Sequence, residues 1–146
     1  MLVKDLLRQK DRRLVTTTAG TDLETAMGQL IDNRISCLPV LDDTGKLIAI
    51  ISDKDIFRAV YESKEQFREL TVGDEMTRDL IVGVGDDSIS YIAGLMTNNR
   101  IRHIPIVEGD ALVGLLSVGD IVKTQMEDIK IENRYLKDFI QGTYPG

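Results

Sequence analysis

Residues 33–41 read Asn-Arg-Ile-Ser-Cys-Leu-Pro-Val-Leu, and residues 99–107 read Asn-Arg-Ile-Arg-His-Ile-Pro-Ile-Val. The two stretches lie 66 positions apart and share the Asn-Arg-Ile start and the proline. Extending the comparison outward over residues 14–60, with Gly45 skipped, aligns 46 pairs, of which ten are identical. Chance would give about three identities at ordinary residue frequencies. The chain is therefore a tandem repeat, and units of about 60 residues are too small for separate robust cores, so we expect them to pack together.

Both units have the same predicted order of elements. A short apolar segment, at residues 14–15 or 80–84, precedes a helix whose apolar residues recur at i, i+3 and i+4. A short strand, a turn and a second, fully apolar strand follow, and a second helix begins near Ser52 or Ser117. The predicted fold class is α+β: two β-α-β-β-α repeats packed together with pseudo-two-fold symmetry.

Polar residues mark where the first helix of each unit begins. Thr21 and Glu24 form a T-x-x-E pattern, which predicts a capping box in the first unit. Asp87 is the predicted N-cap of the equivalent helix in the second unit.

The repeat also predicts the domain organisation. We expect the first unit, with its leader, at residues 1–66, the second at 67–125, and a helical extension at 126–146. The leader at residues 2–5 resembles residues 71–74, so each unit should carry one.

A stripe of apolar residues runs along the C-terminal extension. Ile129, Leu136 and Ile140 are spaced by seven and four residues, with Tyr135 beside them. This spacing indicates a helix that packs on another surface. Two alternatives stay open at this point: a second copy of the chain, or the chain's own core.

Composition excludes several classes of protein. The formal net charge of −6 argues against nucleic-acid binding, which needs a basic face. Apolar runs are all shorter than the roughly 18 to 20 residues that span a bilayer, so we expect no membrane segment and a cytoplasmic location.

A single cysteine, Cys37, excludes an internal disulfide, and with a single histidine it cannot form a His/Cys zinc site. A catalytic Cys37–His103 pair would lack an orienting group, so we expect no enzyme and no required cofactor.

Three stretches together resemble the CBS-domain family, specifically a stand-alone tandem pair known as a Bateman module. They are Asp-Glu-Met-Thr at 74–77, the 99–107 stretch, and Gly-Leu-Leu-Ser-Val-Gly-Asp at 114–120, which fits the family's nucleotide pattern G-h-x-[ST]-x-x-[DN]. The first unit departs from that pattern at Ala49, where glycine is usual. The resemblance covers residues 1–125 and implies clefts between the units that bind adenine-containing ligands.

In the second unit, the resemblance assigns ligand contacts to Ser117 and Asp120. A helix start attracts anions, and a carboxylate matches the two donors of a ribose diol. Gly114 would allow close approach of the neighbouring backbone. From spacing alone, an N-cap pair is the preferred interpretation of Ser117 and Asp120. The family resemblance reverses that preference, and both roles can coexist.

The resemblance places Arg102 and His103 near the ligand phosphates. Arginine offers a fork of donors to phosphate, and the charge of histidine responds to pH. Their alternative is a solvated surface pair.

The remaining predicted contacts are apolar residues for adenine and the equivalent polar residues of the first unit. For any single apolar residue, the alternative is ordinary core, and for Lys54 it is an exposed helix surface. These residues are Val82, Val84, Ile104, Val15, Leu38, Ser52, Asp55 and Lys54.

The resemblance thus implies a regulatory module that binds AMP, ADP, ATP, S-adenosylmethionine or NADH. We expect a homodimer that regulates an effector protein in trans. The alternative is a structural dimerisation module with degenerate clefts.

Overall fold

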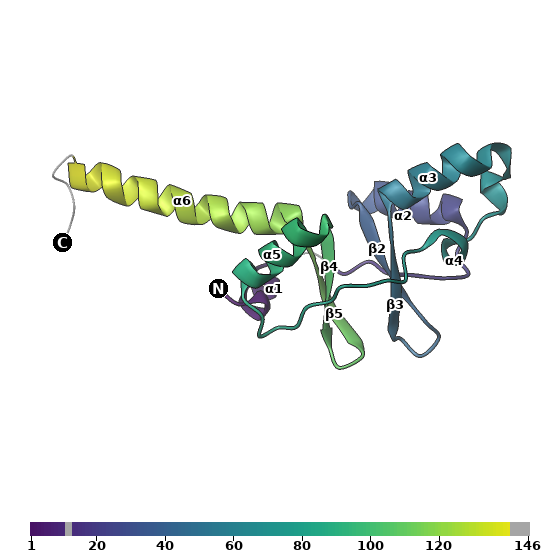
Figure 1. The fold of residues 1–146 in the computed structure, drawn as a ribbon, viewed down its shortest axis with the longest axis horizontal. Helices are drawn as coiled ribbons and strands as arrows, with labels where there is room; N and C mark the ends of the chain where they lie inside the picture. The colour runs from purple at the N-terminus through teal and green to yellow at the C-terminus, as the bar shows by residue number, and fades with distance from the viewer. Residues whose placement is uncertain (11–12, 141–146) are drawn as a thin grey trace.

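The repeat folds into two mixed units, and a long helix extends from the second (Figure 1). The structure is a computed structural model that describes residues 1–10 and 13–140. Along the chain its elements are α1 (Val3–Gln9), β1 (Thr17–Thr18), α2 (Leu23–Asn33), β2 (Cys37–Leu41), β3 (Leu47–Ser52), α3 (Asp53–Ser63), the 3₁₀ helix η1 (Lys64–Glu69), α4 (Val72–Glu75), α5 (Ile89–Asn99), β4 (His103–Glu108), β5 (Ala111–Ser117) and α6 (Val118–Ile140).

Each unit is built on an antiparallel hairpin, β2–β3 in the first and β4–β5 in the second. Both hairpins shift register at equivalent places, between Val40 and Leu41 and between Ile106 and Val107. β1 adds a parallel strand to the first hairpin, and in the second unit, among the described residues, a single parallel bridge from Gly83 to Ile106 takes its place. The predicted β-α-β-β-α order is confirmed, with the first strand of the second unit reduced to that bridge.

The helix starts differ from the predicted caps. Asp22, rather than Thr21, caps α2, because its Oδ1 accepts the Thr25 N–H at 2.7 Å. In the second unit, Ser88 caps α5, while Asp87 accepts the Val84 N–H at 2.8 Å inside the preceding turn. In both units the cap lies one residue later than predicted, because the earlier side chain already has a partner in the turn; Thr21 Oγ1 lies 3.1 Å from Thr18 Oγ1.

The two leaders are exchanged between the cores. Leader α1 buries Val3 and Leu6 in the core of the second unit, and leader α4 helps to bury Val72 in the core of the first. The backbone contacts repeat as well. The Val3 N–H donates to Asp87 O and the Val72 N–H donates to Thr21 O, each at 2.8 Å. Both leaders are therefore present, but each packs in the core of the opposite unit. Leader α1 precedes the first unit and packs in the second core, and α4 precedes the second unit and packs in the first core.

Helix α6 leaves the body after its first two turns (Figure 1). Ile121 and Thr124 are buried, and every described side chain from residue 125 onward is exposed. The alternative in which this helix folds back on its own core is wrong. Within residues 1–10 and 13–140, every helix is too short or too polar to span a bilayer.

Candidate functional site

Ser117 and Asp120 lie where β5 ends and α6 begins. Asp120 Oδ2 accepts the Ser117 N–H at 2.8 Å, and Ser117 Oγ accepts the Asp120 N–H at 3.2 Å. This reciprocal pair satisfies two of the backbone donors that a helix start leaves without partners. The capping interpretation therefore holds. The same two side chains also line a cavity, so capping and ligand contact are compatible.

A cavity of about 420 Å³ lies between the two units at this helix start. Cavities of about 300 to 1,000 Å³ hold small-molecule ligands in proteins. The wall comes from three parts of the chain: α1 and the segment after it, the entry into β2, and the second hairpin with the start of α6. The lining residues are Leu7, Lys10, Arg13, Leu14, Val15, Arg34, Ile35, Ser36, Cys37, His103, Val113, Gly114, Leu115, Ser117 and Asp120.

Lys10 reaches into this cavity from the end of α1. Its Nζ donates to Asp120 Oδ2 at 2.8 Å and to Leu115 O at 2.6 Å. Both side chains of the ion pair are 23% exposed, so solvent screens the pair only in part. Burial by itself raises the pKa of Asp120, but the hydrogen bonds from Lys10 and from the Ser117 N–H outweigh it, and the pKa lies below its usual value. Asp120 is therefore an anion held by a cation 110 residues away in sequence.

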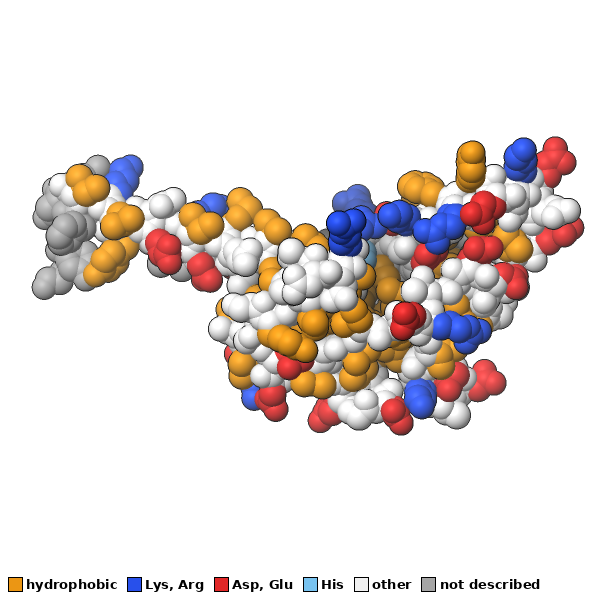
Figure 2. All heavy atoms as spheres, viewed as in Figure 1, with side chains coloured by type: hydrophobic (Ala, Val, Ile, Leu, Met, Phe, Trp, Pro, Cys, Tyr) orange, Lys and Arg blue, Asp and Glu red, His pale blue; other side chains and the backbone are white. Residues whose placement is uncertain are grey.

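The cavity is basic although the chain as a whole is acidic. Lys10, Arg13 and Arg34 line it, against a single carboxylate, Asp120. Arg34 is held there by the left-handed conformation (φ 54°) with which it ends α2. Figure 2 shows Lys and Arg side chains gathered between the two lobes of the molecule. This charge distribution favours an anionic ligand.

His103 is neutral in this cavity at physiological pH. Its Nε2 lies 3.0 Å from Ser36 Oγ, which comes from the other unit. Burial, followed by the positive charge of Arg102, lowers the pKa of His103 to about 4. The imidazole is thus a neutral hydrogen-bonding group that spans the two units.

Cys37 also lines the cavity but carries no reactive thiolate. Burial raises the pKa of its thiol to about 12, and the nearby carboxylates of Asp55 and Asp53 add to the effect. The thiolate, rather than the thiol, is the nucleophilic form of cysteine. The Cys37–His103 pair therefore holds no activated nucleophile at neutral pH.

The structure separates Arg102 from its neighbour His103. Arg102 does not line the cavity; its Nη2 donates to Asp53 Oδ1 at 2.8 Å at the start of α3. Successive residues of a strand point to opposite faces, so the two side chains leave the entry to β4 in different directions. Arg102 consequently lies beside the first unit's helix start, the equivalent of the one that carries Asp120.

That first-unit site is closed by its own contacts. Asp55 is buried, and its Oδ2 accepts the N–H of Ser52 at 3.0 Å and the hydroxyl of Ser52 at 3.1 Å. The hydroxyl of Thr77 lies 3.4 Å from both carboxylate oxygens of Asp55. Lys54 is exposed on the surface of α3. Ser52, Lys54 and Asp55 are thus close together, but none of them lines the described cavity.

The apolar residues predicted for adenine divide into three groups. Val15 lines the cavity. Ile104 and Leu38 are fully buried in the two cores, as the core alternative expected. Val82 and Val84 are exposed on the surface and do not line the cavity. The apolar wall comes instead from other residues: Leu7, Leu14, Ile35 and Val113.

Gly114 leaves room for a side chain of α1 rather than for backbone. A Cβ atom at this position would lie 2.6 Å from Leu7 Cδ2, closer than packed carbon atoms approach. The glycine of the family pattern therefore lets the exchanged leader pack against the wall of the cavity.

Several lining residues carry no signal in the sequence. Lys10, Arg13 and Leu7 belong to the segment before the repeat begins. The partners of Lys10 and Leu7, Asp120 and Gly114, lie more than 100 residues further along the chain. The sequence identified Arg34 only as part of the repeated Asn-Arg-Ile stretch. In the described part of the chain, no group of His, Cys, Asp and Glu side chains could hold a metal ion.

Comparison with solved structures shows the same fold in other proteins. A CBS-domain-containing protein from Agrobacterium tumefaciens is 30% identical with a TM-score of 0.81, and the match covers 86% of this chain and 99% of that one. The CBS domain pair of protein MJ0100, solved with 5′-methylthioadenosine and S-adenosylmethionine, is 29% identical with a TM-score of 0.79, over 88% of this chain and 98% of that one. CBSX2, solved in complex with AMP, is 25% identical with a TM-score of 0.73, over 86% and 96%.

Sequence comparisons agree. The mitochondrial CBS domain-containing protein CBSX3 of Arabidopsis thaliana is 42% identical over 50 residues, and the match covers 34% of this chain and 24% of that protein. The chain thus matches about a quarter of this curated relative. The family model for the CBS domain matches twice, at residues 3–62 and 72–127. The chain therefore belongs to the CBS-domain family and carries two CBS domains in tandem.

Proposed function

We propose that this chain is a regulatory module that binds an adenosine-containing ligand in the cavity between its two CBS domains. One observation carries the proposal: a carboxylate at a helix start, Asp120, shares one cavity with the three basic side chains of Lys10, Arg13 and Arg34. A carboxylate accepts hydrogen bonds from both hydroxyls of a ribose, and basic side chains bind phosphate. The two ends of a nucleotide thus find complementary groups in one space.

The ion pair between Lys10 and Asp120 suggests how the ligand acts on the protein. A ribose bound to Asp120 competes with Lys10 for the carboxylate, and Lys10 then turns to the phosphate. Lys10 follows α1, which packs in the core of the second unit, and Ser36 and Arg34 belong to the first. A ligand that touches both units favours one relative placement of the units, provided that its affinity differs between placements.

The relatives support this ligand class. Protein MJ0100 was solved with 5′-methylthioadenosine and S-adenosylmethionine, and CBSX2 with AMP. All three molecules share adenosine, and AMP adds a phosphate. The excess of basic side chains in the cavity favours ligands that carry phosphate, namely AMP, ADP, ATP and NADH, over 5′-methylthioadenosine and S-adenosylmethionine, which carry none.

We assign ligand contacts to Asp120, Ser117, His103, Gly114 and Val15, which line this cavity. The equivalent site in the first unit, with Ser52, Asp55 and Lys54, would need Asp55 to exchange its bonds to Ser52 for bonds to a ribose. Arg102, beside Asp53, would supply the positive charge there. We expect the Asp120 site to bind first.

The two matched segments are both CBS domains, and we propose that this module regulates a separate effector protein in trans. We propose a homodimer that works in the cytoplasm, where the single buried thiol of Cys37 stays reduced. The alternative function is a structural dimerisation or interaction module whose ligand clefts are degenerate. The exposed apolar side chains of Phe57 and Tyr61 on α3 favour an interface and are compatible with both functions.

Calorimetric titration with AMP, ADP, ATP, S-adenosylmethionine, NADH and adenosine tests the proposal. AMP should bind and should raise the melting temperature in proportion to the logarithm of its concentration. Asp120→Ala should weaken AMP binding by about 10-fold to 100-fold, the effect of losing hydrogen bonds to a charged group.

Asp128→Ala is the matched control, since Asp128 lies on the same helix, is exposed and does not line the cavity. It should leave AMP affinity unchanged. Equal affinity in the Asp120 variant, or no binding of any of the six compounds, would contradict the ligand proposal and favour the structural module.

A further inference from the structure

The exposed part of α6 carries an apolar stripe with a regular spacing. Its large apolar side chains are 43–81% exposed. Successive members of the stripe lie four, three, seven and four residues apart. Asn133 lies four residues after Ile129 and three residues before Leu136, so it divides the interval of seven into four and three. The side chains are Val122, Met126, Ile129, Leu136 and Ile140.

Alternation of four and three is the heptad repeat of a coiled coil. It places Met126, Asn133 and Ile140 at a positions and Val122, Ile129 and Leu136 at d positions. Tyr135 falls at a c position, away from this seam. The region spans residues 122–140, about 27 Å of helix.

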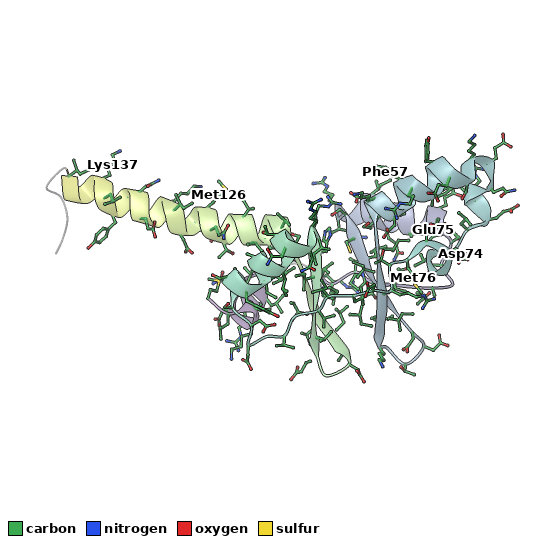
Figure 3. The ribbon with its side chains drawn as sticks, in the orientation of Figure 1. Phe57, Asp74, Glu75, Met76, Met126 and Lys137 are labelled. Carbon is green, nitrogen blue, oxygen red and sulfur yellow. The ribbon has the colours of Figure 1, made fainter. Side chains whose placement is uncertain are left out.

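The seam faces away from the protein's own body. Ile121 and Thr124 pack on the second core and occupy c and f positions, on the opposite side of the helix. Figure 3 shows Met126 and Lys137 on the part of the helix that projects beyond the body. Because the described side chains from residue 125 onward are all exposed, this stripe is an uncovered apolar surface, of the kind that marks an interaction site.

The residues of the seam favour a second copy of this chain as the covering surface. A single asparagine at an a position pairs with the same asparagine in a parallel, in-register dimer, and it selects that register at some cost in stability. Against any apolar surface, or in a shifted register, the amide of Asn133 would lose its hydrogen bonds to water without replacement.

The charges beside the seam select the parallel orientation. The e positions are Lys123, Lys130 and Lys137, and among the described side chains the g positions are Gln125 and Glu132. In a parallel pair each g residue meets the e residue of the next heptad, so Glu132 faces the partner's Lys137, twice by symmetry. In an antiparallel pair the e positions face each other, and the lysines repel.

We propose that residues 122–140 of α6 form a parallel two-stranded coiled coil with a second copy of this chain, in the register that pairs Asn133 with its own equivalent. This inference rests on the homodimer proposed above and identifies the helix that orients it, but it does not depend on ligand binding. Two CBS pairs would then lie at the same end of one stalk.

Cysteine cross-linking in the full-length protein tests the orientation and the register. Leu136→Cys places a thiol at a d position, where a parallel pair brings the two equivalent residues together. Mild oxidation should convert most of this variant into a covalent dimer. Wild type, whose only cysteine is the buried Cys37, is the blank, and Asp128→Cys, at an exposed c position, is the matched control.

The possible outcomes distinguish the coiled coil from the homodimer and from the ligand proposal. Absence of the cross-link at position 136, or equal cross-linking at position 128, overturns the coiled coil. A stable dimer with no cross-link at 136 leaves the homodimer standing and assigns it to other helices. AMP titration of the same samples reports on the ligand proposal, because none of these substitutions lines the cavity.

A charge exchange checks the pairing of Glu132 with the partner's Lys137. Glu132→Lys or Lys137→Glu alone should raise the dimer dissociation constant by about 3-fold to 30-fold, from two symmetric surface pairs. The double variant should return within about threefold of wild type, measured by analytical ultracentrifugation. Additive weakening in the double variant would overturn the parallel arrangement.

Discussion

Acidification should destabilise the folded protein through His103. In the folded state its pKa is about 4, below the ordinary value of 6.5, because the ring is buried and lies near Arg102. Between these two values the unfolded chain binds a proton that the folded protein excludes. The stability linked to His103 is therefore complete above about pH 6.5 and is lost as the pH falls toward 4.

The size of the effect follows from the two pKa values. With 6.5 in the unfolded chain and about 4 in the folded protein, the unfolding free energy falls by about 2 kcal/mol between about pH 7.5 and about pH 5. Carboxylates titrate over part of the same range, so His103 has to be isolated by comparison with a variant that cannot be protonated.

His103→Gln serves this purpose, because glutamine is neutral at all these pH values and can still bond to the hydroxyl of Ser36. Urea denaturation of both proteins at several pH values between about 7.5 and 5 measures the difference. Wild type should lose about 2 kcal/mol more than the variant over this range. Parallel pH profiles would refute a neutral, buried His103. A Ser36→Ala variant controls for the hydrogen bond between the units. It should change the unfolding free energy by the same amount at every pH, so its dependence on pH should have the same slope as in wild type.

Two further predictions concern contacts made by single side chains. Lys10→Met should lower the unfolding free energy at neutral pH by about 1 to 2 kcal/mol, because it leaves Asp120 without its cation; this magnitude lies between those of exposed and buried ion pairs. A double-mutant cycle with Asp120→Asn measures the coupling energy between the two side chains. Strictly additive losses of stability in this cycle would count against the ion pair. Asp22→Ala should lower the free energy of unfolding, measured by urea denaturation, by about 1 kcal/mol, because it removes the N-cap of α2. Thr21→Ala should lower it by less than half as much. Equal losses in the two variants would show that both residues cap the helix.

Much of the fold could be predicted because the relevant signals are local. The spacing of apolar residues along a helix, the apolar hairpins and the repeat at 66 positions are all properties of neighbouring or duplicated residues. The caps of α2 and α5 were predicted one residue early, because Thr21 and Asp87 bond inside the preceding turns, and a sequence pattern does not show which of two adjacent polar side chains turns inward.

The candidate site was predictable only in part. Ser117 and Asp120 belong to one short motif, so their proximity follows from a single helix start. Arg102 and His103 are adjacent in sequence, yet one contacts Asp53 and the other lines the cavity. Strand geometry sends neighbouring side chains to opposite faces, and only the packing of the two units decides which face borders the cavity.

The duplication, the α+β class, the Asp120 motif and the spacing of seven and four residues along the last helix all follow from the amino-acid sequence. Each of these is a pattern within one unit or one helix. The tertiary structure alone decided that the leaders exchange cores and that Lys10 lies 2.8 Å from Asp120. It also decided that α6 projects outward with its stripe uncovered. These features depend on how separate segments share a core, because packing brings together side chains that no local periodicity connects.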